Sequence, residues 1–267
     1  MAAMTSGRTR VTAPTVAPAP GIFDVSAPQT LSEGDIHQLM GVEYESESCV
    51  PINFVTLDPD SCIATAAKET EGLFFEQGDP FHIYAAVECN LFLSGEYESK
   101  AAARLEAGEQ RAVEEQLWEH TFRDRAVNLT PAGGAVSATI ALGLLEEYAG
   151  TVYGGIPTVH AGHRLTVHLA AKGLVKGTEL ATKSKFVSGA GYTGVTGPDD
   201  EAVPPAPVVA GVNEVWMYIT GEVALRRGPT RTFTATETVT NDLMALAERS
   251  YVPTVDCMVG AILVTLE

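Results

Sequence analysis

The sequence has no apolar run of the ~18–20 residues that a membrane-spanning helix needs. Positive charge is also scarce: 17 lysines and arginines stand against 34 acidic residues, for a net charge of −17 at pH 7. Because so acidic a protein repels phosphate groups, the composition argues against sequence-specific nucleic-acid binding. The first residues lack the apolar region of a signal peptide, so we expect neither secretion nor a membrane anchor.

Cysteine is rare and carries no motif. None of the four cysteines forms a C-x-x-C pair, and their spacing matches neither a zinc site nor a disulfide framework. They are Cys49, Cys62, Cys89 and Cys257. We therefore expect reduced thiols in a cytosolic protein, most of them simply buried.

Signatures of catalysis are missing as well. The chain has no G-x-S-x-G nucleophile motif. Residues 189–194, GAGYTG, match G-x-G-x-x-G, but dinucleotide binding requires a strand before the motif and a helix after it. Asp199, Asp200 and several prolines follow instead, so we interpret residues 189–211 as a flexible surface loop.

Three histidines, His160, His163 and His168, lie close together in the sequence. A metal site would need their imidazoles on one face together with a carboxylate. His163 and His168 are five residues apart, off the i, i+4 face, and no H-E-x-x-H pattern is present. We interpret all three as ordinary histidines on a helix surface and predict no catalytic, cofactor or metal site.

The strongest pattern in the sequence is a strand that leads directly into a long helix. Apolar residues occupy every second position from Phe81 to Leu93, which is the period of a strand with one buried face. Residues 99–122 then show helical spacing, with a stripe that includes Leu105, Gly108 and Ala112. At 1.5 Å per residue this helix is about 36 Å long. Such a helix suits a flat scaffold better than the centre of a globule.

The remaining elements are mixed. Helical patterns cover residues 32–40, 135–149, 162–175 and 242–249. The last third is otherwise rich in strands, including a row of alternating threonines from Thr232 to Thr240 that suits an edge or surface strand. Helices and strands do not alternate as βαβ units, so the sequence predicts an α+β fold.

Two segments read as extensions from the body. Residues 1–20 are rich in proline, threonine and alanine, which favours an extended arm. Residues 43–80 contain nine acidic residues and one lysine, Lys68, between short β-like patches. We interpret this stretch as a long hairpin that reaches away from the body.

In order and in detail, these stretches resemble the short major capsid proteins of tailed bacteriophages of actinobacteria, which adopt the Hong Kong 97 shell fold. The resemblance covers roughly residues 21–267. It rests on PFHIYAAVECN followed by ESKAAARLEAGEQRAVEEQLWEHTF, whose end carries Ala112, Val113, Glu114, Leu117 and Trp118. It also rests on YGGIPTVHAGHRLTVHLAAKGLV, EVWMYITGEVALRRGP and NDLMALAERSYVPTVDCMVGAILVTLE.

The resemblance implies an N-terminal arm, an extended β-hairpin loop, a peripheral domain built on a long spine helix, and an axial domain. By that resemblance the segments are 1–30, arm; 31–80, extended loop region; 81–134, peripheral strand and spine helix; 135–212, axial domain; 213–242, peripheral strands; and 243–267, the return strand in the axial domain.

The implied function is structural rather than enzymatic: a head-shell protein that assembles as pentamers and hexamers into an icosahedral shell around double-stranded DNA. The partners would be its own copies, a separate scaffold, a portal and decoration proteins, with only non-specific contact to DNA. It would assemble in the bacterial cytoplasm and reside in the virion. Two alternatives stay open: an encapsulin-type nanocompartment shell, and a metal-dependent hydrolase that uses His160 and His163.

A few residues are selected as structural or subunit-interface candidates, while catalytic, cofactor and metal residues are predicted to be absent. The candidates are Glu69, Phe74, Phe75, Leu105, Trp118, Arg226 and Arg227.

Overall fold

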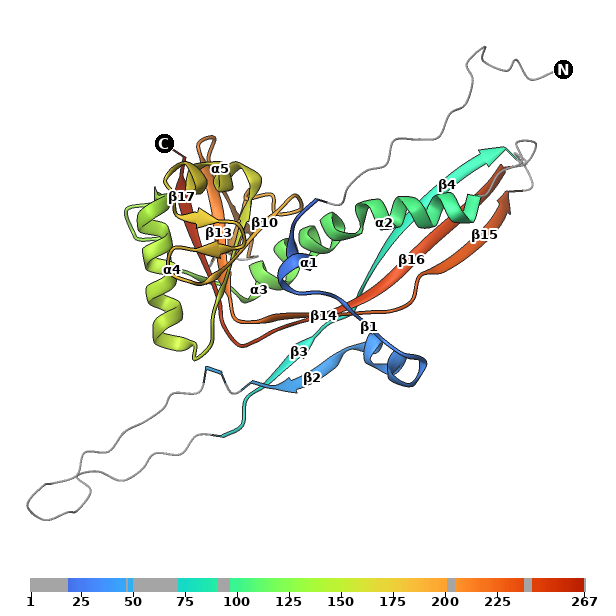
Figure 1. Ribbon diagram of the computed structural model, residues 1–267, viewed down its shortest axis with the longest axis horizontal. Helices are drawn as coiled ribbons and strands as arrows, with labels where there is room; N and C mark the ends of the chain where they lie inside the picture. Colours follow the sequence, from blue (N-terminus) through green and yellow to red (C-terminus); the bar gives the residue numbers. More distant parts are fainter. Residues whose placement is uncertain are drawn as a thin grey trace, which may run out of the picture.

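A computed structural model describes residues 19–46, 48–49, 72–90, 97–200, 205–237 and 242–266. The described part of the chain is elongated, with two β-sheets placed end to end along the long axis (Figure 1). One sheet carries a long helix on one face, and the other packs against two shorter helices. The arrangement confirms the predicted α+β class.

The first sheet has five strands and supports the long helix. Its strands are β1 (Gln29–Thr30), β4 (Phe81–Asn90), β14 (Val223–Arg227), β15 (Arg231–Glu237) and β16 (Asp242–Val255). β16 is the central strand and pairs antiparallel with β4, β14 and β15. The predicted strand is confirmed over Phe81–Asn90, where Ile83 and Val87 are buried, and residues 91–93 lie outside the described residues.

The long helix extends almost as predicted. α2 (Tyr97–Gln116) continues into a π-helical turn, η2 (Leu117–Phe122), and then into α3 (Arg123–Arg125). Its buried stripe runs at four-residue steps through Leu105, Glu109 and Val113. Gly108, expected in the stripe, is exposed. The i, i+4 face therefore includes a glutamate where we expected only apolar and small residues.

The second sheet has eight strands and contains the other core cluster. Its strands are β5 (Val127–Asn128), β6 (Val136–Ser137), β7 (Thr158–Gly162), β8 (Val175–Lys176), β9 (Glu179–Leu180), β10 (Lys185–Gly189), β13 (Glu214–Thr220) and β17 (Val259–Thr265). The helices α4 (Ala138–Val152) and α5 (His163–Ala171) pack against it through apolar side chains. A small separate hairpin consists of β11 (Thr196–Asp199) and β12 (Pro207–Val209).

Two strand connections join the sheets. β13 of the second sheet leads through Gly221 into β14 of the first, and β16 of the first leads back into β17 of the second. The two connections run side by side, because β13 pairs with β17 in the second sheet and β14 pairs with β16 in the first. The crossing is therefore a two-stranded ribbon.

The N-terminal part of the described chain lies across this crossing. It comprises α1 (Ile22–Val25), β1, the 3₁₀ helix η1 (Glu33–Met40), and a hairpin of β2 (Val42–Glu45) and β3 (Phe75–Gly78). The hairpin lies outside both large sheets (Figure 1). The predicted helix over residues 32–40 is present in 3₁₀ form. Most of the predicted arm and residues 50–71 of the predicted long loop lie outside the described residues.

Two local predictions are wrong. Residues 242–249 are predicted to be helical, but they belong to β16, where Ala245 and Ala247 are buried against α2. Pairing with β4 on one side and β15 on the other outweighs the helix preference of its leucines and alanines. Residues 189–211 are not simply loop, because they include the hairpin β11–β12.

The sheets divide the last third of the chain differently from the predicted segments. β13, expected among the peripheral strands, lies in the eight-stranded sheet with β17. Most of β16, expected in the axial return strand, lies in the five-stranded sheet under α2. The division into arm, extended loop, peripheral domain and axial domain stays a prediction.

Candidate functional site

The histidines of the predicted cluster do not meet. His160 lies in β7 and is fully buried, whereas His163 begins α5 and is exposed. The two ring nitrogens of His160 contact the Tyr192 hydroxyl at 3.0 Å and the Thr220 hydroxyl at 2.9 Å. Desolvation lowers the pKa of His160 to about 3, so its ring is neutral. The prediction of a helix-surface histidine is therefore wrong for His160.

Nothing in the described part of the chain gathers three or more metal-ligating side chains. In the same residues, no helix is long and apolar enough to cross a membrane. The hydrolase alternative loses its proposed pair of ligands, because His160 faces hydroxyl groups inside the core and His163 points from a separate element. The polar groups that the fold does gather have a different role: they anchor one element to another.

The first anchor is a buried carboxylate on α2. Glu114 accepts a hydrogen bond from the backbone N–H of Ile22 at 3.0 Å and another from that of Gly191 at 2.9 Å. Gln110 donates to the carbonyl of Ala19 at 2.9 Å. One helix thus holds the start of α1 and the glycine-rich loop together. Desolvation raises the pKa of Glu114, and the two backbone donors offset part of that rise.

The glycine motif is explained by this anchor rather than by a nucleotide. A Cβ atom at Gly189 would lie 2.7 Å from the carboxyl carbon of Glu114, and one at Gly191 would lie 2.2 Å from the carbonyl oxygen of Arg111. Both positions are buried against α2 and accept no side chain. The interpretation of residues 189–194 as a flexible surface loop is therefore wrong. A hairpin and not a helix follows the motif, in agreement with the sequence analysis.

A second anchor ties α2 to the first sheet. Glu109, on the buried stripe, accepts hydrogen bonds from Arg249 and from the Tyr251 hydroxyl, both on β16. Arg227 of β14 lies 3.6 Å from the same carboxylate. Removal of one partner would leave a buried charge unpaired, and this cluster therefore fixes the helix on the sheet in one position.

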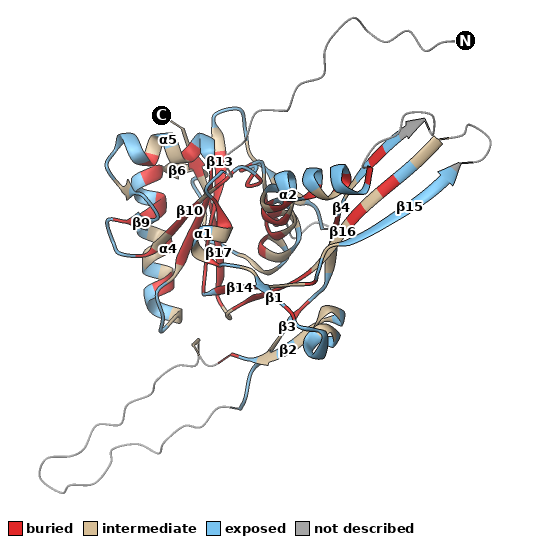
Figure 2. Ribbon diagram, turned by 45° about the vertical axis from the view of Figure 1, so that its right-hand side comes forward, coloured by how far each residue is buried: buried red, intermediate tan, exposed pale blue. Residues whose placement is uncertain are grey.

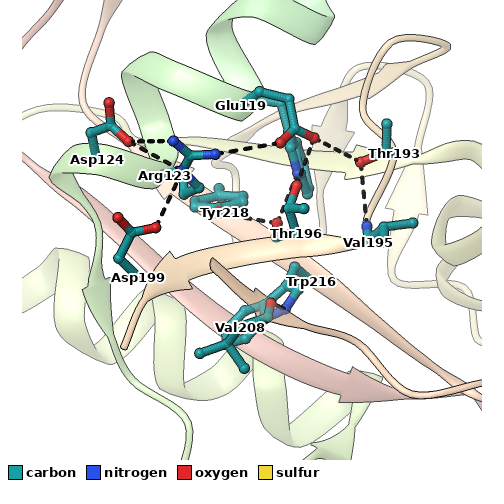
Figure 3. A network of polar contacts seen from close by, with 11 residues as sticks. Glu119, Arg123, Asp124, Thr193, Val195, Thr196, Asp199, Val208, Trp216 and Tyr218 are labelled. Atoms are coloured by element: carbon teal, nitrogen blue, oxygen red, sulfur yellow. Dashed lines mark hydrogen bonds and ion pairs between the residues drawn. The ribbon is translucent and has the colours of Figure 1, made fainter. Parts of the chain in front are cut away.

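A third anchor joins the end of the long helix to the hairpin β11–β12 (Figure 3). Arg123 contacts Glu119, Asp124 and Asp199, and Glu119 accepts the Thr196 hydroxyl at 2.6 Å. The indole of Trp118 donates to the carbonyl of Thr196 at 3.0 Å. The long helix, which packs on the first sheet, is therefore also fixed to the hairpin β11–β12. This contact joins the two parts of the molecule in addition to the two-stranded ribbon.

The fourth anchor holds the β2–β3 hairpin against the crossing point. Tyr44 donates its hydroxyl hydrogen to the carbonyl of Val255 at 2.7 Å. Ser46 donates to Asp256 at 2.8 Å. Arg125 of α3 pairs with Glu76 of β3 at 2.8 Å. These bonds set the direction in which the hairpin leaves the body.

A disulfide strengthens the same junction. Cys49, just after β2, is bonded to Cys257 between β16 and β17, with a Cα–Cα distance of 6.1 Å. The expectation of reduced thiols is thus wrong for this pair. The two cysteines are 208 residues apart in sequence, and only the tertiary fold brings them together.

This bond predicts a specific thiol count. Alkylation of the protein after denaturation without reductant should label only two of the four cysteines, and alkylation after reduction should label all four. Mass spectrometry of the intact chain measures the difference directly. Tryptic mapping should leave Cys49 and Cys257 unlabelled in the first sample. Four labelled cysteines without reductant, in protein purified without reducing agent, would contradict the bond.

The structure describes six of the seven candidate residues and places them in three settings: the core, the β2–β3 hairpin and β14. Leu105 and Trp118 are buried within the single chain, so they support the fold. Phe74 and Phe75 are more than half exposed at the start of the β3 arm of the hairpin. Glu69 lies outside the described residues.

The two arginine candidates stabilise β14. Arg226 donates to the Thr254 hydroxyl at 3.2 Å, across to β16. Arg227 donates to the Thr30 hydroxyl at 2.9 Å, on β1, in addition to its contact with Glu109. Both therefore act within the chain, whereas contacts between subunits by any of the seven candidates remain a proposal.

Sequence reasoning missed Glu109, Glu114, Tyr44 and Asp256. For the two glutamates a signal existed. Glu109 lies four residues after Leu105 on the apolar stripe, and Glu114 lies four residues before Trp118, so both fall on faces that should be buried. Tyr44 and Asp256 carried no such signal because their partners are about 210 residues away.

The fold has clear matches among solved structures. The chain is similar over 98% of its length to 96% of a chain in the capsid of a native GTA particle, with a TM-score of 0.62 and 10% identity. The chain has a capsid fold of the Hong Kong 97 type. A chain in the head structure of the Helicobacter pylori bacteriophage KHP40 matches with a TM-score of 0.54 and 8% identity, over 99% and 95% of the two chains.

A chain of Mycobacterium phage Che8 matches this capsid fold as well, with a TM-score of 0.53, 11% identity, and 98% of each chain covered. No family model matches the sequence, and no curated protein matches it. These chains therefore share the Hong Kong 97-type fold although only 8–11% of their residues are identical to those of this chain. The predicted fold is confirmed.

Proposed function

We propose that this chain is the major capsid protein of a tailed bacteriophage, which self-assembles into a closed shell around double-stranded DNA. The observation that carries the proposal is the full-length match to a capsid chain, which includes the spine helix, both sheets and the hairpin. The anchors described above fit this role, because they fix the shape of a thin subunit instead of building a reactive cavity.

The charge of the chain supports the same role. A shell that encloses DNA must not bind it tightly, and a net charge of −17 disfavours contact with phosphates. Pentamers and hexamers, a separate scaffold, a portal, decoration proteins and assembly in the bacterial cytoplasm belong to the proposal. The encapsulin-type shell shares the fold, but the matched structures described above are phage and GTA particles, which favours the virion.

Expression of the chain alone tests the proposal. We expect size-exclusion chromatography to yield very large particles, and negative-stain electron microscopy of that fraction to show closed shells, tubes, or rings of five or six subunits. Co-expression with a scaffold from the same genome should raise the fraction of closed shells. A small monodisperse oligomer under both conditions would contradict a shell function. Packaged DNA in particles isolated from phage lysate would separate the virion from a nanocompartment.

A further inference from the structure

β15 is an edge strand that the described part of the chain leaves open. It pairs only with β16, and every residue from Arg231 to Thr236 is exposed, on both faces of the strand. It lies at the outer margin of the five-stranded sheet (Figures 1 and 2). On β4, the other outer strand at this end, Arg104 of α2 donates a hydrogen bond to the carbonyl of Ala86.

β15 has charged residues only at its two ends and lacks several other protections that are usual for an edge strand. Natural proteins guard such edges with prolines, lysines, bulges or short strands, because an open row of N–H and C=O groups pairs with other strands. The sequence of β15 is RTFTATE, which has neither proline nor lysine. Its register with β16 runs without a shift over all seven residues. An edge this regular is suited to pairing.

The sequence of β15 is also complementary to itself. In an antiparallel pair centred on Thr234, residue 231 of one copy stands opposite residue 237 of the other, so that an arginine meets a glutamate at both ends. Thr232 then stands opposite residue 236, another threonine, and Phe233 opposite Ala235. Opposite charges and threonine pairs at directly opposed positions each stabilise antiparallel strands.

The apolar side chains on one face support the same pairing. Phe233 is 49% exposed and stands opposite Leu246 of β16. Met244, which stands opposite Ala235 on the same face, is 44% exposed. Pairing of two β15 strands would place Ala235 of the second copy beside Phe233 and would cover part of this patch. Unpartnered apolar surface of this kind marks an interaction site.

We propose that β15 pairs with β15 of a second copy, antiparallel about a two-fold axis through Thr234, and joins two five-stranded sheets into one. The proposal rests on the proposed shell function, in which the two copies are neighbouring subunits. A single strand edge buries less than a standard interface of ~1,600 Å², so the contact acts together with the others in a shell.

Engineered disulfides test both the contact and its register. In a background with Cys62→Ser and Cys89→Ser, Thr234→Cys puts equivalent residues of the two copies opposite each other, at roughly 4.5–5.5 Å between Cα atoms, within disulfide range. Thr232→Cys is the matched control, because its own copies would lie about 13 Å apart along the strands. Thr232→Cys mixed with Thr236→Cys should cross-link again.

After mild oxidation of the purified protein, we expect about tenfold more covalent dimer on a non-reducing gel for Thr234→Cys than for Thr232→Cys alone, because Cα atoms about 13 Å apart lie beyond disulfide range. Normal particles without a Thr234→Cys dimer, or with equal dimer for both variants, would overturn the pairing and leave the shell function intact. A dimer without particles would support the pairing against the shell. Absence of both dimer and particles would reject both proposals.

A charge exchange provides a second test. Arg231→Glu or Glu237→Arg alone would place like charges opposite each other and lower the particle yield, whereas the double variant should restore it. Hydrogen exchange on the wild-type chain needs no substitution: the β15 amides should become protected on assembly. Unchanged β15 exchange between free subunits and particles would overturn the proposal, and β15 protection without a Thr234→Cys dimer would point to a different extended segment as its partner.

Discussion

Replacement of Trp118 by alanine is expected to lower the free energy of unfolding by about 3–5 kcal/mol, the range typical of a buried tryptophan. Trp118 is fully buried where the long helix meets the second sheet. Its ring packs edge-on against Tyr218 with a centroid distance of 4.5 Å and against Tyr192 at 5.3 Å. The substitution also leaves the carbonyl of Thr196 without its indole donor.

A urea melt of unassembled subunits measures this effect. Trp118→Phe should recover most of the packing and lose only the hydrogen bond, so its loss should be smaller. Tyr84→Ala is the control for removal of an aromatic ring, since Tyr84 is 71% exposed and its loss should stay within about 0.5 kcal/mol. If Trp118→Ala and Tyr84→Ala had the same midpoint and slope, the helix–sheet junction would not depend on Trp118.

Acid is expected to destabilise the subunit through His160. In the folded chain the pKa of His160 is lowered from 6.5 to about 3 by burial, so the unfolded chain binds the proton more readily. The stabilising contribution is therefore complete above pH 6.5 and is lost as the pH falls from 6.5 towards 3. The loss is about 1.4 kcal/mol per pH unit, or about 2 kcal/mol by roughly pH 5.

Melts at several pH values between 7 and 5 test this slope. His160→Gln keeps a polar side chain beside Tyr192 and Thr220 but cannot gain a proton, so its stability should vary less with pH than that of the wild type. His163→Gln is the control for the loss of a histidine at an exposed position. Nuclear magnetic resonance of the His160 ring gives an independent reading. Titration of that ring near pH 6.5 in the folded protein would refute the argument.

The sequence predicts the elements whose burial has a simple period. The alternation after Phe81 and the stripe through Leu105 and Val113 involve only residues two to four positions apart within one strand or one helix. Both patterns are confirmed in the described residues. Their order predicts the α+β class, and the shell fold is predicted from that order together with the specific stretches that carry the family resemblance. The same reasoning failed for residues 242–249, where helix-forming residues are held in β16 by partners on both sides.

The anchors could be predicted only in part. The positions of Glu109 and Glu114 on the buried face of the helix were visible in the sequence, but a high acid content makes each glutamate look solvated. The Cys49–Cys257 bond and the contact of Tyr44 with Val255 join residues more than 200 positions apart. Such pairs have no local period, because only the crossing of the two-stranded ribbon brings them together.

That ribbon has a mechanical consequence. In the proposed shell, tension along the long axis of the subunit would run along the strands from one sheet into the other. Two covalent backbones, β13–β14 and β16–β17, would then share this tension. The hydrogen bonds between them would be loaded in shear and at the same time, instead of being opened one after another. The Cys49–Cys257 bond ties the segment after β2 to one of these two backbones, next to the crossing. The subunit should therefore resist stretching along the strands more strongly than twisting about them.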